Sequence, residues 1–208
     1  MRDRLVPALI LAGGLSRRMG RDKASAELGG KPMIVRIAER IGPQVTALAI
    51  NAPEAFTAGI DLPLVPDTIA GRPGPLAGVL AGLRRAAAMT PAATHLLTVP
   101  ADTPFLPLDL VARLEGAAAA RDQIVLAASA GQVHPVVALW PLSLADDLEV
   151  WLTEPGNRKL QAFIARHPSL AVDFPLLATP AGKLDPFFNV NTPDDLATAE
   201  RFLEVLGE

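Results

Sequence analysis

The amino-acid sequence predicts an α/β protein whose mostly parallel sheet is covered by helices on both faces. The first observation behind this prediction is that short, almost wholly apolar segments alternate along the chain with segments of helical periodicity. The second is that several of these segments end at glycine, asparagine or aspartate, at the edge of the sheet where ligands bind in such folds. With 208 residues, of which 50% are hydrophobic and 20% charged, the chain suits one globular domain spanning 1–208.

The first half of the chain contains the expected start of this sheet. Four short segments without formally charged residues are expected to be buried strands: 7–11, 45–50, 62–65 and 94–99. Residues 33–41 repeat apolar side chains at helical spacing between Pro32 and the pair Gly42-Pro43, which punctuate a helix. Residues 76–83 carry a second apolar stripe at the same spacing, so we expect another helix there.

The second half continues the alternation. Three further strands are expected at 124–128, 133–140 and 170–174. Helices are expected over 108–120, 142–152 and 160–164. A final helix is expected to begin at Thr192, because threonine caps helices, Pro193 fits a first turn and the acidic pair after it favours the positive end of the helix dipole.

The net charge limits the expected partners, and the cysteine content indicates the cellular compartment. Because 19 basic and 22 acidic residues give a formal net charge of −3, bulk electrostatics offers no reason to expect nucleic acid as a partner. The absence of cysteine suits a reducing compartment. Arg2 and Arg4 resemble the start of a signal peptide, but no cleavage pattern follows, and no apolar run approaches the roughly 20 residues of a membrane helix. We therefore expect a cytoplasmic protein that binds neither nucleic acid nor membrane.

The loop after the first expected strand is the main candidate for a ligand site. The apolar segment ends at Gly13-Gly14, where the backbone can bend sharply or approach a ligand closely. Four cationic side chains follow shortly after: Arg17, Arg18, Arg21 and Lys23. Cations beside open backbone N–H groups suit a polyanion, most commonly a nucleoside triphosphate, and the alternative is a glycine turn with a solvated basic face.

Two common phosphate-binding loops are excluded by spacing. A P-loop requires Gly-Lys followed by Ser or Thr, whereas Gly20 is followed by Arg-Asp-Lys, and the dinucleotide pattern Gly-x-Gly-x-x-Gly is absent. The loop is therefore of another type. In a parallel sheet it is expected to share one site with the other strand-end residues: Gly13, Gly14, Asn51, Asp67 and Asp102.

Several motifs in one order carry a resemblance to a known family. The loop reads L-A-G-G-x-S-x-R-M-G-x-D-K, which resembles the signature of nucleotidyltransferases that join an NTP to a small phosphorylated molecule. Further matching stretches are R-P-G-P-L-A-G at 72–78, P-A-D-T-P-F at 100–105, His134-Pro135, Asn157-Arg158, and F-N-V-N-T-P at 188–193. Over most of its length the chain resembles the molybdenum cofactor guanylyltransferases.

The resemblance implies a three-layer, Rossmann-like fold of the nucleotide-diphospho-sugar transferase type. It also implies that GMP is transferred from GTP to the terminal phosphate of molybdenum-molybdopterin, with Mg²⁺ as cofactor and release of pyrophosphate. The catalytic residues would be Arg18, Lys23 and Asp102, and Asp102 would hold the metal. The nucleotide would be bound by Leu11, Ala12, Gly13, Gly14, Lys23, Asn51, Asp67, Gly78 and Asp102, and the pterin by Arg158, Asn189 and Asn191. The resemblance also implies transient contacts with molybdenum-insertion proteins and with proteins that mature the target enzyme.

Local chemistry agrees with these implied roles. Cations such as Arg18 and Lys23 stabilise charge that develops on an α-phosphate and on leaving pyrophosphate. A strand-end aspartate supplies the hard oxygen that Mg²⁺ prefers. Gly13 stands where the related cytidylyltransferases tend to have alanine, and the missing methyl group would admit the larger purine.

Several of these residues have a structural alternative. Asp102 can be a helix or turn cap, Asn51 and Asp67 can be turn residues, and the Asn189–Asn191 stretch can shape the turn before the last helix. Arg158 and Lys159 can be cations on a helix surface. For His134 a structural role and a ligand role are both open. His95 is expected to be structural, His167 to lie in a surface turn, and Trp140 and Trp151 to lie in the core.

Two other functions fit the same residues. One is a nucleotidyltransferase that uses CTP with molybdopterin, or that acts on another metabolite such as a sugar phosphate. The other is a noncatalytic adaptor that binds GTP or cofactor, which would not need the complete charge-stabilising and metal-binding set.

Overall fold

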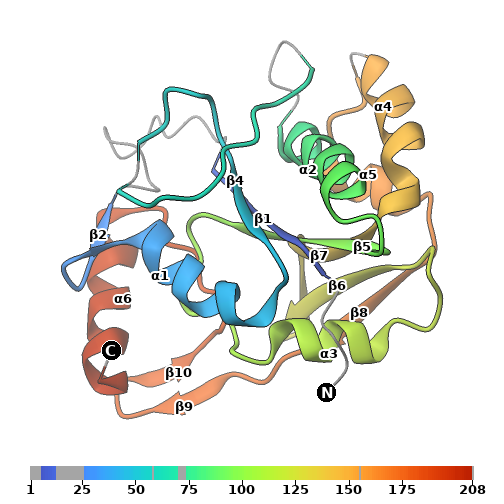
Figure 1. Ribbon diagram of the computed structural model, residues 1–208. Coiled ribbons are helices and arrows are strands. Elements are labelled where there is room, and N and C mark those ends of the chain that lie inside the picture. Colours follow the sequence, from blue (N-terminus) through green and yellow to red (C-terminus); the bar gives the residue numbers. More distant parts are fainter. Residues whose placement is uncertain (1–5, 13–25, 58, 70–73, 155, 208) are drawn as a thin grey trace.

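A six-stranded sheet forms the centre of the protein, in the computed structural model that describes residues 6–12, 26–57, 59–69, 74–154 and 156–207. The strands follow the order β4 (Leu48–Asn51), β1 (Ala8–Leu11), β5 (His95–Pro100), β7 (Gln132–Pro141), β6 (Ile124–Ser129) and β8 (Ser169–Asp173) (Figure 1). All of them run in one direction except β7, which pairs antiparallel with β5 and β6. The expected mostly parallel sheet is confirmed.

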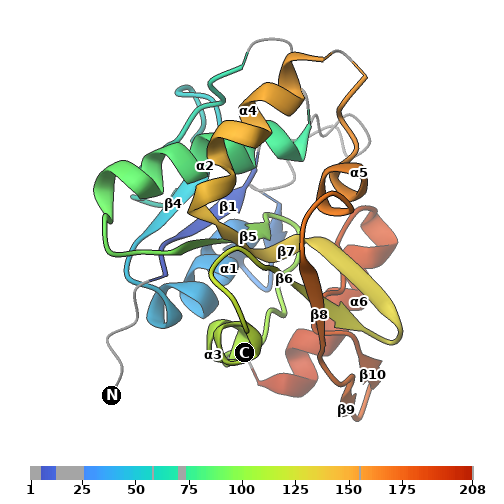
Figure 2. The ribbon, with the colours of Figure 1, turned by 90° about the vertical axis from the view of Figure 1, so that its right-hand side faces the viewer.

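Helices cover both faces of this sheet, as the sequence predicts. One face carries α1 (Met33–Ile41), α3 (Leu110–Ala117) and α6 (Pro193–Leu206), and the other carries α2 (Pro75–Met89), α4 (Ala145–Thr153) and α5 (Leu160–Ile164) (Figure 2). Short 3₁₀ helices at Gly42–Gln44 and Leu142–Leu144 follow α1 and precede α4. None of the helices within the described ranges combines the length and apolar character needed to cross a bilayer.

Alternate side chains of the strands supply two separate cores. In β1, Ala8 and Ile10 belong to the core beneath α1, α3 and α6, whereas Leu9 belongs to the core beneath α2, α4 and α5. The alternation arises because successive side chains of a strand point to opposite faces of a sheet. Since both faces are buried, the strand sequence is apolar throughout, which is why it could be identified from sequence.

The strand expected at 62–65 is not formed. Leu64 makes only an isolated parallel bridge with Ile50. Pro63, whose nitrogen faces β4, has no N–H group to donate, so the ladder cannot extend on that side of the bridge. The segment nevertheless lies beside β4, which is the placement that the site requires.

Two short hairpins appear that the sequence does not predict. β2 (Glu27–Leu28) pairs with β3 (Lys31–Pro32), and β9 (Leu177–Thr179) pairs with β10 (Gly182–Leu184). Strands of two or three residues are too short to show the alternation by which a strand is recognised. The helix expected over 108–120 is also shorter, because Asp109 occupies its N-cap and Ala118 is already extended.

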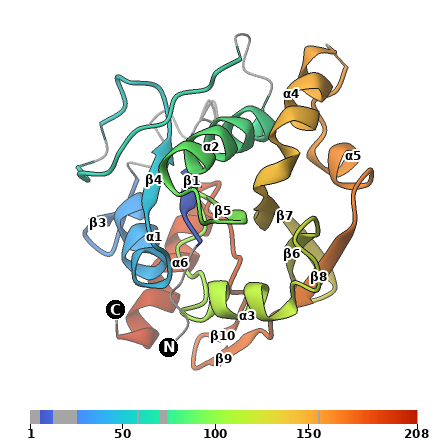
Figure 3. The same ribbon diagram turned by 45° about the vertical axis from the view of Figure 1, so that its right-hand side comes forward.

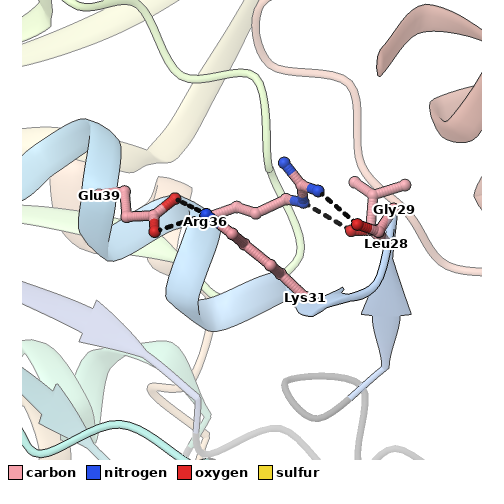
Figure 4. A network of polar contacts seen from close by, with 5 residues as sticks. All are labelled: Leu28, Gly29, Lys31, Arg36 and Glu39. Atoms are coloured by element: carbon pink, nitrogen blue, oxygen red, sulfur yellow. Dashed lines mark hydrogen bonds and ion pairs between the residues drawn. The ribbon is translucent and has the colours of Figure 1, made fainter. Parts of the chain in front are cut away.

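A buried arginine of α1 fixes the turn between β2 and β3 (Figure 4). Arg36 is only 8% exposed, and its Nε and Nη2 donate to the carbonyl oxygens of Leu28 and Gly29 at 2.6 and 3.0 Å. Gly29 has a φ of +56°, and a Cβ at this position would overlap a side chain of α6. Lys31 Nζ pairs with Glu39 at 2.9 Å on the outside of the same turn. The turn is therefore held between α1 and α6.

The last helix begins as the sequence predicts. The Thr192 side chain accepts a hydrogen bond from Asp195 N at 3.1 Å, and Asp195 Oδ2 accepts one from Thr192 N at 2.9 Å. This reciprocal pair is a capping box, with Pro193 in the first turn. The start of α6 is thereby fixed, and with it the end of the preceding segment.

Replacing the cap tests its contribution. We expect Thr192→Ala to lower the free energy of unfolding by about 1 kcal/mol, because the Asp195 N–H loses its partner. Urea denaturation followed by circular dichroism measures the change. Thr198→Ala, which removes an exposed hydroxyl from the interior of the same helix, is the matched control and is expected to shift stability by less than about 0.5 kcal/mol. Equal losses in both variants would contradict the cap assignment.

Candidate active site

The ends of three neighbouring strands bring several of the predicted site residues together. Leu11, the last residue of β1, lies opposite Asn51 of β4 on one side and Pro100 of β5 on the other. Beyond the ladder, Ala12 N donates to Asn51 O at 3.0 Å, and Ala101 N donates to Leu11 O at 3.2 Å. The chain thus leaves β1 between the ends of β4 and β5. Asp102 follows β5 by two residues at the same edge.

The Gly13-Gly14 pair and the cations that follow it lie outside the described residues. The structure therefore says nothing about the positions of Gly13, Gly14, Arg18 and Lys23, and their roles stay predictions. What the structure does give is the start of that loop at Ala12, directly beside the end of β4.

Asn51 joins the end of β4 to the segment that contains Asp67. The Asn51 side chain is 4% exposed, and its Nδ2 donates to Val65 O and to Asp67 Oδ1, both at 2.9 Å. These two bonds use both N–H groups of the amide. The structural alternative for Asn51 therefore agrees with the geometry. The same bonds hold the exposed Asp67 at the carboxyl edge, where its predicted nucleotide role would place it.

Gly78 lets helix α2 approach the strand ends closely. An added Cβ would overlap Asn51 Oδ1 and would lie 2.9 Å from Leu11 Cδ2. Because this glycine lies in the first turn of α2, the start of the helix packs closely against the ends of β1 and β4. Figure 3 shows α2 crossing beside these two strands. The positive end of a helix dipole at this edge favours an anion. Gly78 thus allows the close packing of α2 on the strand ends because it has no side chain. This packing explains why the motif has glycine at this position.

Asp102 is part of a turn that ties β5 to a distant segment. Its backbone oxygen accepts a hydrogen bond from Val190 N at 2.8 Å. The following α3 has Asp109 as its N-cap, so the helix-cap alternative for Asp102 is wrong. The turn alternative is compatible with the structure. The carboxyl group is half-buried and stands at the edge where Leu11 and Asn51 end their strands.

Asn189 is brought to the same strand end as Asp102. Thr103, which is 1% exposed, donates its hydroxyl to Asn189 Oδ1 at 2.6 Å. Asn189 itself is exposed, and the N–H₂ group of its amide is a donor that this bond does not use. Asn191 N donates to Asp195 Oδ2 at 3.0 Å, which agrees with the expected turn before α6.

Arg158 and Lys159 lie in a different setting from the expected helix surface. Both are exposed and come directly before α5, with Lys159 at its N-cap. The helix that they precede, α5, packs on the face of the sheet opposite to α6. Their predicted pterin role stays a prediction.

His134 has a hydrogen-bonded partner that the sequence does not reveal. Its Nε2 lies 2.7 Å from Ser129 Oγ at the end of β6, and the same hydroxyl lies 2.8 Å from both carboxylate oxygens of Asp185. Burial lowers the pKa of His134, and the negative charge of Asp185 opposes part of this effect. The expected structural histidine is therefore compatible with the geometry. Sequence reasoning missed Ser129 and Asp185, because nothing local marks a serine–aspartate pair so far apart in the chain.

The other aromatic and histidine residues have structural surroundings. Trp140 is fully buried, and Trp151 packs at the margin of the same core. His95 is 7% exposed, its Nδ1 lies 2.9 Å from Thr94 Oγ1, and burial lowers its pKa. His167 follows α5 and is more enclosed than a surface turn implies, because its ring packs on a core phenylalanine and its Nε2 lies 3.1 Å from an aspartate of α4.

The lowered pKa values of His95 and His134 predict acid sensitivity. Folding favours the neutral ring, so the unfolded chain binds more protons than the folded one once the pH drops below the ordinary value of about 6.5. The free energy of unfolding is therefore expected to fall as the pH is lowered from 7.5 to 5.5. Urea denaturation across this range measures it, and His95→Asn is expected to flatten the decline. Stability that stays constant or rises on acidification would contradict the prediction.

The described carboxylates suit a metal held mainly by its substrate. No group of three or more histidine, cysteine or acidic side chains that could hold a metal ion occurs within the described ranges. Mg²⁺ needs no such cage, because it is usually bound through one or two carboxylates together with substrate phosphates and water. A single half-buried aspartate at a strand end, Asp102, fits that requirement.

Comparison with known proteins places this fold among the nucleotidyltransferases. A crystal structure of molybdopterin-guanine dinucleotide biosynthesis protein A from Archaeoglobus fulgidus superimposes with a TM-score of 0.73 and 25% identity, covering 95% of this chain and 98% of that one. The fold is shared with 4-diphosphocytidyl-2C-methyl-D-erythritol synthase from Anaerococcus prevotii, at a TM-score of 0.67, 14% identity and coverage of 97% and 96%.

The family follows from sequence similarity. A model described as "MobA-like NTP transferase domain" matches residues 8–173. A protein of Rhizobium meliloti (strain 1021) named molybdenum cofactor guanylyltransferase is 53% identical, with 97% of this chain and 94% of the relative covered. The chain belongs to the MobA-like NTP transferase family.

Proposed function

We propose that the protein transfers GMP from GTP to the terminal phosphate of molybdenum-molybdopterin and forms the guanine dinucleotide cofactor. The observation that carries the proposal is the 53% identity, over almost the whole chain, to a relative named molybdenum cofactor guanylyltransferase. In this reaction a phosphate oxygen of the acceptor forms a bond to the α-phosphorus of GTP. The bond between that phosphorus and the bridging oxygen to the β-phosphate breaks, and pyrophosphate leaves.

The nucleotide would bind over the ends of β1 and β4. The close approach of α2 at Gly78 directs the start of that helix toward this edge, and Asn51 fixes the loop that carries Asp67. Backbone N–H groups at Gly13-Gly14 would lie against the triphosphate, since no Cβ obstructs them. Arg18 and Lys23 would stabilise the charge that develops on the α-phosphate and on leaving pyrophosphate.

Asp102 is the residue that would hold Mg²⁺. A bound Mg²⁺ would supply charge neutralisation and alignment of the phosphates. The hydrogen bond from Val190 to the backbone oxygen of Asp102 supports this role, because it holds the turn that carries the carboxylate at the end of β5. On the acceptor side, Asn189 would present its amide N–H₂ to the pterin or to its phosphate.

A reaction panel tests the proposal. Purified protein is incubated with molybdenum-molybdopterin or a sugar phosphate, with GTP or CTP and with or without Mg²⁺, and pyrophosphate release is measured. We expect release only with GTP, molybdenum-molybdopterin and Mg²⁺ together. Turnover with a sugar phosphate and none with molybdopterin would refute the acceptor assignment.

The fold alone does not decide the base or the acceptor, because it is shared with a synthase named for a cytidyl compound, 4-diphosphocytidyl-2C-methyl-D-erythritol. The panel therefore includes CTP as a direct competitor. A noncatalytic adaptor is the second alternative, and it predicts GTP binding without pyrophosphate release under every condition.

A further inference from the structure

Ser129, His134 and Asp185 form a hydrogen-bonded cluster at the edge of the sheet where β6 ends and β7 begins. Ser129 is fully buried, and its hydroxyl lies 2.8 Å from both carboxylate oxygens of Asp185 and 2.7 Å from His134 Nε2. A hydroxyl has one proton, which goes to the carboxylate, so His134 donates its Nε2 proton to the serine oxygen. This polarity is opposite to that of an activated nucleophile, where the histidine accepts the serine proton. The cluster is thus a set of fixed contacts.

Asp185 connects this cluster to a turn of the backbone. Asp185 Oδ1 also accepts from Phe187 N at 2.8 Å, and Asp185 O accepts from Phe188 N at 3.0 Å. The ring of Phe187 is 3% exposed and packs against the imidazole of His134 with centroids 4.7 Å apart. The serine, the histidine and the aspartate therefore fix one end of the segment 185–191, which links β10 to α6.

The other end of segment 185–191 is fixed at the candidate active site. Val190 N donates to Asp102 O at 2.8 Å, and Asn189 Oδ1 accepts from Thr103 Oγ1 at 2.6 Å. The capping box of α6 follows immediately. The segment therefore spans from the end of β6 to the end of β5. Because Asp185 and Asn189 lie close together in this segment, a displacement of Asp185 is expected to displace Asn189 as well.

We propose that Ser129, His134 and Asp185 are positioning residues for the acceptor side of the transfer site, acting by anchoring segment 185–191. The proposal rests on the proposed function. Among the residues that the structure describes, the exposed side chain of Asn189 makes one hydrogen bond, to Thr103, so its position depends on where the backbone of the segment lies. A buried hydroxyl–carboxylate contact is strongly directional, and it fixes one backbone position where apolar packing would tolerate several.

Variants of the full-length protein test this anchoring. Ser129→Ala and Asp185→Ala remove the contact, whereas Asp185→Asn keeps an oxygen that accepts from both Ser129 and Phe187. Thr98→Val is the matched control. Thr98 is fully buried in β5, and its hydroxyl also makes two hydrogen bonds, to Val136 O at 2.7 Å and from Trp140 Nε1 at 2.9 Å, both with residues of β7 and neither with segment 185–191.

Two readouts separate anchoring from general loss of stability. By mass spectrometry, amide hydrogen exchange in peptides covering 185–191 is expected to accelerate roughly 10- to 100-fold in Ser129→Ala and Asp185→Ala, but not in Thr98→Val. The KM for molybdenum-molybdopterin is expected to rise by a similar factor while the KM for GTP stays unchanged. Asp185→Asn should restore both values most of the way. Because Asp185 is only partly buried, its variants are expected to fold, and they provide the test if Ser129→Ala does not fold.

The outcomes distinguish this inference from the function on which it rests. Unchanged exchange in both alanine variants overturns the anchoring, whatever the activity. Faster exchange with an unchanged KM for the acceptor, or with an equal rise in the KM for GTP, overturns the assignment to the acceptor side. Absence of pyrophosphate release by the wild-type protein overturns the proposed function, and the acceptor assignment falls with it.

Discussion

Asp102→Asn is expected to reduce kcat by about 10²- to 10³-fold, the size of effect seen when one charge-stabilising group is removed from a polar transition state. The substitution preserves shape and keeps the backbone oxygen that accepts from Val190, so the turn is expected to survive. What it removes is the negative charge of the carboxylate that would hold Mg²⁺. Steady-state pyrophosphate release at several Mg²⁺ concentrations measures the loss, and the Mg²⁺ concentration for half-maximal activity is expected to rise.

Asp109→Asn is the matched control for this experiment. Asp109 is an exposed aspartate of the same connection between β5 and α3, and its side chain makes no capping hydrogen bond. Its substitution is expected to leave kcat unchanged. If Asp102→Asn turned over at the wild-type rate, the catalytic role of Asp102 would be wrong. If the variant bound GTP normally and still delivered cofactor to a target enzyme, the adaptor alternative would gain.

Segments buried on both faces of the sheet could be located from the sequence. The side chains of β1, and most of the apolar side chains of β5 and β6, belong to or pack against one of the two cores, so the chain shows apolar runs that end where the sheet ends. Asn51 and Asp102 could be proposed as neighbours for the same reason, since each follows such a run. The sheet topology then brings the two strand ends together beside Leu11.

The contacts that hold the site together could not be predicted, because they join residues distant in sequence. Asp185 meets Ser129 across 56 positions, and Asn189 meets Thr103 across 86, with no local pattern to mark either pair. The burial of Arg36 could not be predicted from the sequence either. A cation within a helical pattern suggests a solvated face, yet here it is buried because two carbonyl oxygens of a neighbouring turn accept its protons.

Gly78→Ala is expected to weaken GTP binding by roughly 10- to 100-fold, because the new methyl group would occupy the position of Asn51 Oδ1. The Asn51 amide cannot shift without losing its bonds to Val65 O and Asp67 Oδ1, and leaving a buried polar group unpaired costs about 1–3 kcal/mol. The loop that carries Asp67 would then lose its attachment to β4. Isothermal titration with GTP measures the affinity, and urea denaturation measures the accompanying loss of stability.

Gly82→Ala provides the control within the same helix. A Cβ there would lie 2.7 Å from the ends of two leucine side chains, Leu9 and Leu96, which can shift, whereas the obstacle at Gly78 is a hydrogen-bonded amide. Overpacking in the control is expected to cost about 1–3 kcal/mol of stability, offset by up to about 1 kcal/mol from the higher helix propensity of alanine. Its affinity for GTP is expected to match the wild type, because Leu9 and Leu96 lie away from the strand ends. GTP binding that is equal in the two variants would show that the approach of α2 to Asn51 does not shape the nucleotide site.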